Sequence, residues 1–215
     1  FAYISSKVGD AKKSKAHGFA LPSFVRNEKD RQEREALRLR YLDKWISKMM
    51  RRFESAWKDG PIYHGVEDYA YAAVGRTYQI GEVGGVLRNN ILERRPNGRG
   101  GGTLRLHDPL AVKLFATNTA KASKEEMIEV VRARWGEDFS RFGGAEEDLS
   151  DAYIVARMVW TEVHLRAGVV ELSGLEEGER RIFLRTTKSY PVNVLDRPWT
   201  YVSNEQDKDI EEALT

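Results

Sequence analysis

The chain has 215 residues, 41% of them hydrophobic, which is enough to bury one sizeable core with a small extension but hardly two full domains. Its 35 lysines and arginines nearly balance its 33 aspartates and glutamates, so affinity for a polyanion must come from local clusters of charge. The absence of cysteine excludes disulfides, thiolate nucleophiles and sulfur-bound zinc. No apolar run reaches the roughly 18 residues of a membrane span and no signal-like segment opens the chain, so we expect a cytoplasmic protein without a membrane partner.

The first part of the chain changes from a strand pattern to a helical one. Residues 1–6 and 13–24 are predicted as two strands of a hairpin, because a short polar segment separates two apolar runs. Apolar residues then recur at steps of three and four, which predicts a long helix over 27–60. The short apolar segment 61–67 is predicted as a strand that ends at Glu67.

Strand and helix patterns alternate through the rest of the chain up to residue 168. The predicted elements are a helix over 75–95, a glycine-rich connection over 95–102, a strand over 103–109, a short helix from 109, and helices over 123–136 and 146–168. Ser123 with Glu126 three residues later forms a capping box, which supports the start of the fifth of these elements. A hairpin followed by alternating strands and helices predicts an α/β fold, a mixed sheet with helices on its faces.

The end of the chain has a different character. Two short apolar runs around "GLEEGE" within 168–202 predict a small hairpin, and 205–215 is an acidic tail. We therefore expect a core over residues 1–167 and a C-terminal extension over 168–215.

Two acids open a strongly apolar predicted helix. Asp148 and Asp151 are three residues apart and so share one helix face, next to positions that should be buried. Carboxylates that close together beside a core repel each other unless a cation neutralises them. Together with Glu67 at a strand end, they form a set of hard oxygen donors that suits Mg²⁺ or Mn²⁺.

A simpler interpretation exists for each of these acids taken alone. Asp148 or Ser150 would cap the helix, and Asp151 would favour its positive N-terminal dipole. Glu67 would be a solvated acid at the end of a strand. The metal site is favoured by the combination of the three acids, not by any one of them.

The order of elements and motifs resembles the RuvC-like Holliday-junction resolvases of the ribonuclease H-like superfamily over roughly residues 1 to 165. The segments that carry the resemblance are "VEDYAY", "GEVGGVL", "AVKLFATNTAKASKEEM" and "DLSDA". It implies a ribonuclease H-like mixed sheet flanked by helices and four metal-binding acids, of which Glu67, Asp148 and Asp151 match. The family's first acid lies on its opening strand, and we expect that strand to precede Phe1. The alternative is that the chain has lost this acid and, with it, full metal binding. Asp10 falls in the predicted hairpin turn and does not take its place.

The resemblance also implies an activity. Family members are structure-selective endodeoxyribonucleases that resolve four-way or other branched DNA by two-metal-ion hydrolysis, with Mg²⁺ or Mn²⁺ as cofactor. Lys113 and Lys124 are implied to approach the scissile phosphate, where a cation offsets developing negative charge. Without the resemblance, both lysines would be interpreted as solvated surface residues.

The resemblance implies further contacts with DNA and with a second subunit. Arg76, Tyr78 and Arg88 lie on or near the helix after Glu67, where the family meets DNA, and Tyr69 either stacks on an unpaired base or packs in the core. Arginines around the glycine run either contact phosphates or keep a loop solvated; they are Arg94, Arg95, Arg99 and Arg105. Family members act as homodimers, in the cytoplasm of a bacterium or a phage-infected host.

Two alternatives to junction resolution remain. One is a ribonuclease H-like module that binds DNA without cutting it. The other is a related nuclease that acts on flaps, forks or RNA–DNA hybrids, because substrate choice depends on geometry that spacing does not reveal.

Overall fold

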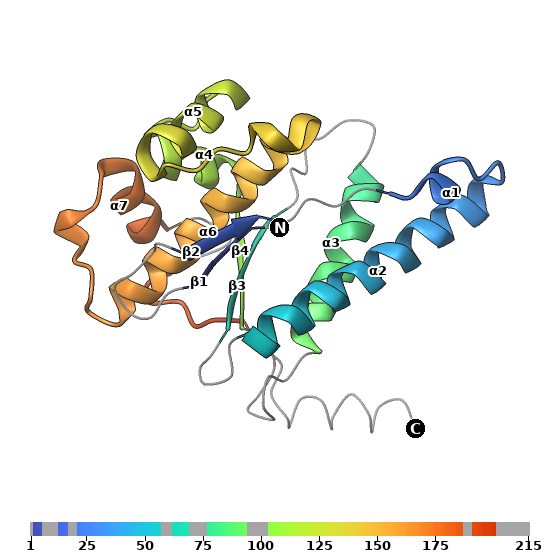
Figure 1. The fold of residues 1–215 in the computed structure, drawn as a ribbon. Helices are drawn as coiled ribbons and strands as arrows, with labels where there is room; N and C mark the ends of the chain where they lie inside the picture. The colour runs from blue at the N-terminus through green and yellow to red at the C-terminus, as the bar shows by residue number, and fades with distance from the viewer. Residues whose placement is uncertain are drawn as a thin grey trace, which may run out of the picture. The chain divides into compact units, whose positions relative to one another are not determined.

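The structure is a computed structural model that describes residues 2–5, 13–16, 21–56, 62–68, 77–93, 103–186 and 191–200 (Figure 1). The side chains of residues 2–5, 13–16, 53–56 and 77–80 are outside this description. The chain divides into two compact units. Unit 1 comprises residues 1–19, 65–68 and 106–198, and unit 2 comprises residues 20–64, 69–105 and 199–215. The described helices include none that is long and apolar enough to cross a membrane.

The first two strands form the predicted hairpin pair. β1 (Ala2–Ser5) and β2 (Lys13–Ala16) are antiparallel, with Ala2 opposite Ala16. The second predicted strand was too long, because residues 23–26 form a short helix, α1 (Ser23–Arg26), directly after Pro22. Proline at that position fits the start of a helix.

The next two strands pair with each other. β3 (Tyr63–Glu67) and β4 (Thr103–His107) form a two-stranded sheet. The hydroxyl of Thr103 donates to the carbonyl of Ile62 at 2.8 Å, and the amide of Asp68 donates to the carbonyl of His107 at 2.7 Å. The first bond joins the N-terminal ends of the two strands and the second joins their C-terminal ends, so the strands are parallel. The described strands thus form two two-stranded sheets, and only these parts of the expected mixed sheet are seen.

Four α-helices follow among the described residues of unit 1, and three of them were predicted. They are α4 (Pro109–Thr117), α5 (Lys124–Trp135), α6 (Glu146–Arg166) and α7 (Glu177–Leu184), with 3-10 turns at Ser140–Ala145 and Leu172–Gly174. The capping box of α5 is confirmed: the Ser123 side chain accepts from the amide of Glu126, and the Glu126 side chain accepts from the amide of Ser123. Gly136, at a φ of 72°, ends α5 in the left-handed conformation that suits glycine.

α6 is the central helix of unit 1. Ile154 and Met158 are fully buried on it, and they belong to one hydrophobic core together with Phe115 of α4, Val131 of α5 and Phe183 of α7. The prediction that α6 is largely buried is therefore confirmed. Burial of its apolar face, more than helix propensity, holds α6 in place.

The hairpin predicted around "GLEEGE" is wrong, because α7 begins there. Ile182 and Phe183 pack into the core from one face of this helix, so the apolar run belongs to a helix and not to a strand. Gly178 allows the close contact with α4, because a Cβ atom there would collide with the carbonyl of Leu114. Its amide donates to Oδ1 of Asn118 at 2.6 Å. The domain boundary after residue 167 stays a prediction, and residues 205–215 lie outside the described residues.

Unit 2 contains α1 and two long helices that pack on each other, α2 (Arg31–Ala56) and α3 (Thr77–Leu92) (Figure 1). The apolar residues whose repeat predicted this helix lie on a buried face, as Leu42, Ile46 and Met49 show. Between the helices, the buried Asn90 accepts from the hydroxyl of Ser47 at 2.7 Å. The residues in which the long helix was predicted to end, 57–60, lie outside the described ones.

The C-terminal segment also contributes to unit 2. Thr200 pairs with Leu104 in an antiparallel bridge. Trp199 lies against Tyr63 with ring centroids 4.9 Å apart, and the guanidinium carbon of Arg105 lies 4.6 Å from the centroid of the Trp199 ring. Arg105 is buried, so its side chain is not available to contact a phosphate or to keep a loop solvated. Both interpretations of Arg105 from the sequence are therefore wrong.

Candidate active site

The ends of β3 and β4 lie side by side and both carry acids. Glu67 is the last residue of β3, and Asp108 directly follows β4. The carboxyl ends of neighbouring parallel strands meet at one edge of a sheet, and the Asp68–His107 hydrogen bond joins them there. Ligands of open α/β sheets bind at such an edge.

A close contact between β3 and α6 brings the acids of α6 to the same edge. A Cβ atom on Gly65 would lie 2.5 Å from Cγ2 of Val159 and 2.7 Å from Cγ1 of Val155, so α6 rests directly on the strand. Asp151 is four residues before Val155, about 6 Å along the helix axis. Glu67 is two residues beyond Gly65, about 6.6 Å along the strand. Glu67 and Asp151 are thus each only a few residues from the same contact between strand and helix.

The electrostatics of Glu67 agree with this geometry. The pKa of its carboxyl is raised to about 7, first of all by partial burial in the surrounding protein, although the side chain is still exposed to solvent at the strand end. The negative charges of Asp151, Asp148 and, more weakly, Asp108 contribute to this rise, and the ammonium of Lys113 opposes it. The charges of both α6 acids therefore act on Glu67, although Glu67 is far from them in the sequence.

The capping interpretation of the α6 acids is wrong. The helix begins at Glu146 after Ala145, which makes no side-chain capping bond, so Asp148 lies inside the first turn. The hydroxyl of Ser150 donates to the carbonyl of Glu146 at 2.9 Å and is not a cap either. Asp151 lies further along and is half-buried, and burial followed by the charge of Asp148 raises its pKa.

Both predicted lysines lie beside these acids. Their positive charges lower the pKa of Asp151, which gains proton affinity from burial and from Asp148. Nζ of Lys113, on α4, donates to the carbonyl of Ala122 at 2.8 Å and so ties the loop after α4 to that helix. Lys124, the first residue of α5, pairs with the carboxylate of Glu147 in the first turn of α6.

Glu67, Asp148 and Asp151 suit a divalent cation in two respects, the type of their donor atoms and their charge. Carboxylate oxygens are the donors that Mg²⁺ and Mn²⁺ prefer. The charges of Asp148 and Asp151 raise the pKa of Glu67, and the charge of Asp148 raises the pKa of Asp151, so the acids hold an excess of negative charge that a cation would relieve. As their side chains are placed, however, no three histidine, aspartate or glutamate residues of the described part of the chain form a ligand group for one ion. The acids are gathered but do not form a closed coordination shell.

Of the four residues that the resemblance implies as DNA contacts, Tyr69, Arg76, Tyr78 and Arg88, only Arg88 has a described side chain. It lies on α3 in unit 2 and is half-buried. Tyr69 and Arg76 lie outside the described residues, and Tyr78 belongs to α3 without a described side chain. Their role in binding DNA stays a prediction.

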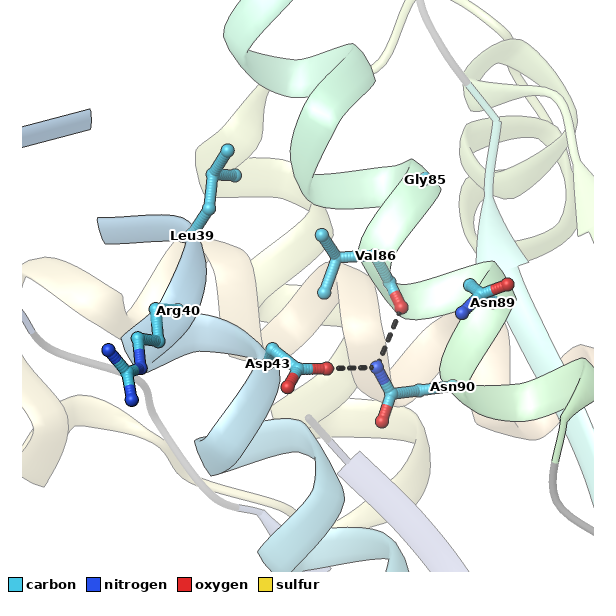
Figure 2. A pocket seen from close by; sticks show the side chains of 7 residues that line it. All are labelled: Leu39, Arg40, Asp43, Gly85, Val86, Asn89 and Asn90. Carbon is cyan, nitrogen blue, oxygen red and sulfur yellow. Dashed lines mark hydrogen bonds between the residues drawn. The ribbon is translucent and has the colours of Figure 1, made fainter. Parts of the chain in front are cut away.

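Unit 2 carries a separate hollow, an open groove of about 400 Å³ between α2 and α3 (Figure 2). Its lining residues are Leu39, Arg40, Asp43, Gly85, Val86, Asn89 and Asn90. The side-chain amide nitrogen of Asn90 donates to Oδ1 of Asp43 on α2 and to the carbonyl of Val86 on α3, so the first of these bonds links the two helices at the groove. The lining contains none of the acids or lysines described above, so the groove is distinct from the candidate active site.

Two residues near the site were not predicted from the sequence. Asp108 follows a strand as directly as Glu67 ends one, and this parallel was the available signal. Oδ1 of Asp108 also accepts from the amide of Leu110 at 2.9 Å and caps α4. Glu147 gave no signal, because acids are common in the first turn of any helix and its partner Lys124 is 23 residues away.

Comparison with known proteins identifies the fold. The structure of Thermus thermophilus RuvC matches with a TM-score of 0.51 and 19% sequence identity, over 78% of this chain and 87% of that chain. No family model matches the chain, and no curated protein does. The chain has a RuvC-like, ribonuclease H-like fold, as the resemblance in its sequence implied.

Proposed function

We propose that this chain, which has the fold of RuvC, is a structure-selective endodeoxyribonuclease that cuts four-way or other branched DNA junctions. The observation that carries the proposal is the electrostatic coupling of Glu67 on β3 to Asp148 and Asp151 on α6. These are the acids that the resemblance implies as metal ligands, and their charges interact although they are about eighty residues apart in the sequence.

The reaction would be hydrolysis of a phosphodiester with Mg²⁺ or Mn²⁺, two ions per active site. Glu67, Asp148 and Asp151 would hold the cations, and the resemblance implies one further acid for the complete set. The bound cations would supply an activated water and stabilise the departing oxygen. The residues of the chain supply the negative charge that attracts the ions, with Glu67 in its deprotonated form.

Lys113 and Lys124 would act on the DNA. Each lies near enough to the acids to affect the pKa of Asp151, so each can also approach a phosphate bound there. A lysine in this position offsets the negative charge that accumulates on the phosphate in the transition state. Lys113 is the more fixed of the two, because it is bonded to the carbonyl of Ala122.

The partners would be branched DNA and a second copy of the chain. Symmetric cutting of a four-way junction requires two active sites related by a twofold axis, which a homodimer provides. Arg76, Tyr78, Arg88 and Tyr69 would contact the DNA. Roles in DNA recombination and repair, in the cytoplasm of a bacterium or a phage-infected host, would follow from this activity.

One observation favours a second candidate function. The described residues contain no ready-made ligand group for a metal ion. A module that binds branched DNA without cutting it would need none. A nuclease for flaps, forks or RNA–DNA hybrids would use the same acids and would differ only in its substrate.

The experiment is cleavage of an end-labelled four-way junction with Mg²⁺, beside linear duplex, flap, fork and hybrid substrates. The wild type should cut the junction in preference to the others, and Asp151→Asn should lose at least about 100-fold in rate. Glu129→Gln, an exposed acid on α5, is the control and should cut like wild type. Tight binding without cutting would support the non-cleaving module, and equal cutting by wild type and Asp151→Asn would remove the catalytic assignment.

A further inference from the structure

Two basic residues of α5 hold the first turn of α6, and their bonds differ. Arg132 pairs with Glu146 and also with Asp138, so its guanidinium has two acidic partners. Lys124 pairs with Glu147. Glu146 and Glu147 are neighbours immediately before Asp148, and this gives the chain a matched pair of acids for comparison.

The Lys124–Glu147 pair is open to solvent. The two side chains are 66% and 42% exposed. Exposed ion pairs of this kind contribute little to stability, since water and salt screen them and both side chains lose freedom. The pair can therefore open at low cost, whereas the buried Glu162 that accepts from Arg166 is fixed in the protein interior.

The position of the pair gives it a role toward DNA. Lys124 is close enough to Asp148 and Asp151 for their charges to act on it. A DNA phosphate that reaches the acids therefore approaches the ammonium of Lys124, which is already paired with the carboxylate of Glu147. The phosphate and the carboxylate would compete for Lys124, because both are anions that bind one ammonium.

We propose that Glu147 is a positioning residue that holds Lys124 in the DNA-free protein and releases it to a backbone phosphate of the bound DNA. The inference rests on the proposed function, and it names an exchange of partners at the same site. Glu147 thus lowers affinity for DNA in general. It keeps the lysine directed toward the acids until a phosphate replaces the carboxylate.

The test is the affinity of the full chain for a four-way junction, measured without divalent cation over a range of salt concentrations. Glu147→Gln should bind roughly 3- to 10-fold more tightly near 0.1 M salt, because Lys124 no longer has to leave a carboxylate. The plot of log K against log salt should steepen by up to about 0.9, the slope of one further phosphate contact. A merely structural role would weaken binding and leave this slope unchanged.

Two controls separate the exchange from a general effect of charge. Glu146→Gln removes the same charge one residue earlier, but Arg132 keeps Asp138 as a partner, so binding should change much less. In a Lys124→Met background, Glu147→Gln should have no further effect. Equal tightening by Glu146→Gln, or tightening that persists without Lys124, would overturn the inference.

The outcome also separates this inference from the proposed function. If the wild type cuts the junction and Glu147→Gln binds like wild type, only the inference fails. If the wild type neither binds nor cuts branched DNA, the proposed function fails and the inference fails with it.

Discussion

Gly65 of β3 lies directly against Val155 of α6, with no room for a side chain between them. This contact sets the spacing between the strand that ends in Glu67 and the helix that carries Asp148 and Asp151. A position two residues from a predicted metal ligand is thus also a packing constraint for the whole site.

Replacing Gly65 by alanine should destabilise the protein and displace Glu67. The new methyl group would overlap Val159 and Val155, which are β-branched and cannot easily turn away. Overpacking of this kind costs about 1–3 kcal/mol in the free energy of unfolding, which chemical denaturation measures. Gly85→Ala on α3, where a Cβ atom meets nothing within 4 Å, is the control and should be neutral or stabilising. Equal stability of Gly65→Ala and wild type would show that the strand and helix are not in contact.

The carboxyl of Glu67 should titrate near neutral pH. Its pKa is raised to about 7 by burial together with the charges of Asp151, Asp148 and Asp108, against the opposing charge of Lys113. Carbon-13 NMR of labelled glutamate would follow the titration in wild type and in Asp151→Asn. The pKa should fall in the variant, because a repelling charge has been removed. An identical titration in both proteins would show that the two acids are not close.

The raised pKa also predicts a direction for stability against pH. The pKa of Glu67 is about 7 in the folded chain, compared with the ordinary value of 4.5 that applies to the unfolded chain. The folded state therefore binds more protons than the unfolded state between about pH 4.5 and 7. The contribution of Glu67 to the free energy of unfolding therefore falls as pH rises through this window. Glu67→Gln should remove the loss and be more stable than wild type at pH 8 by about 1 kcal/mol, reduced by solvent screening of an exposed group. A variant less stable than wild type at pH 8 would contradict this.

A divalent cation should stabilise the protein more at high pH than at low pH. Ligand carboxylates must be deprotonated to bind a cation, and Glu67 is largely protonated at pH 6 if its pKa is about 7. The rise in Tm with millimolar Mg²⁺ or Mn²⁺ should therefore be larger at pH 8 than at pH 6. Asp151→Asn should remove most of the effect, and Glu129→Gln should keep it. A rise in Tm that is the same at both pH values, or that survives in Asp151→Asn, would place cation binding elsewhere.

The features predicted correctly were those encoded in short stretches of sequence. The capping box at Ser123 and the apolar face of α6 each depend on residues within a few turns of a helix. α7 was mistaken for part of a hairpin, because a short apolar run does not distinguish a buried helix from a strand until its packing against α4 is known.

The site was predictable in part for a related reason. Glu67, Asp148 and Asp151 stand out by their places at element ends, but spacing alone gives no distance between them. The pairing of Lys124 with Glu147 joins two helices and depends on how α5 and α6 pack, which local patterns do not specify. Asp108 could be assigned to the site only once β3 and β4 were known to be parallel neighbours.

The most direct test of the central claim, that acids of β3 and α6 act as one site, is a double-variant cycle on junction cleavage with Glu67→Gln, Asp151→Asn and both together. Residues that act as a unit are non-additive, so each single variant should lose at least about 100-fold in rate and the double variant should lose little more. Losses that multiply in the double variant, or wild-type cleavage by either single variant, would contradict the account.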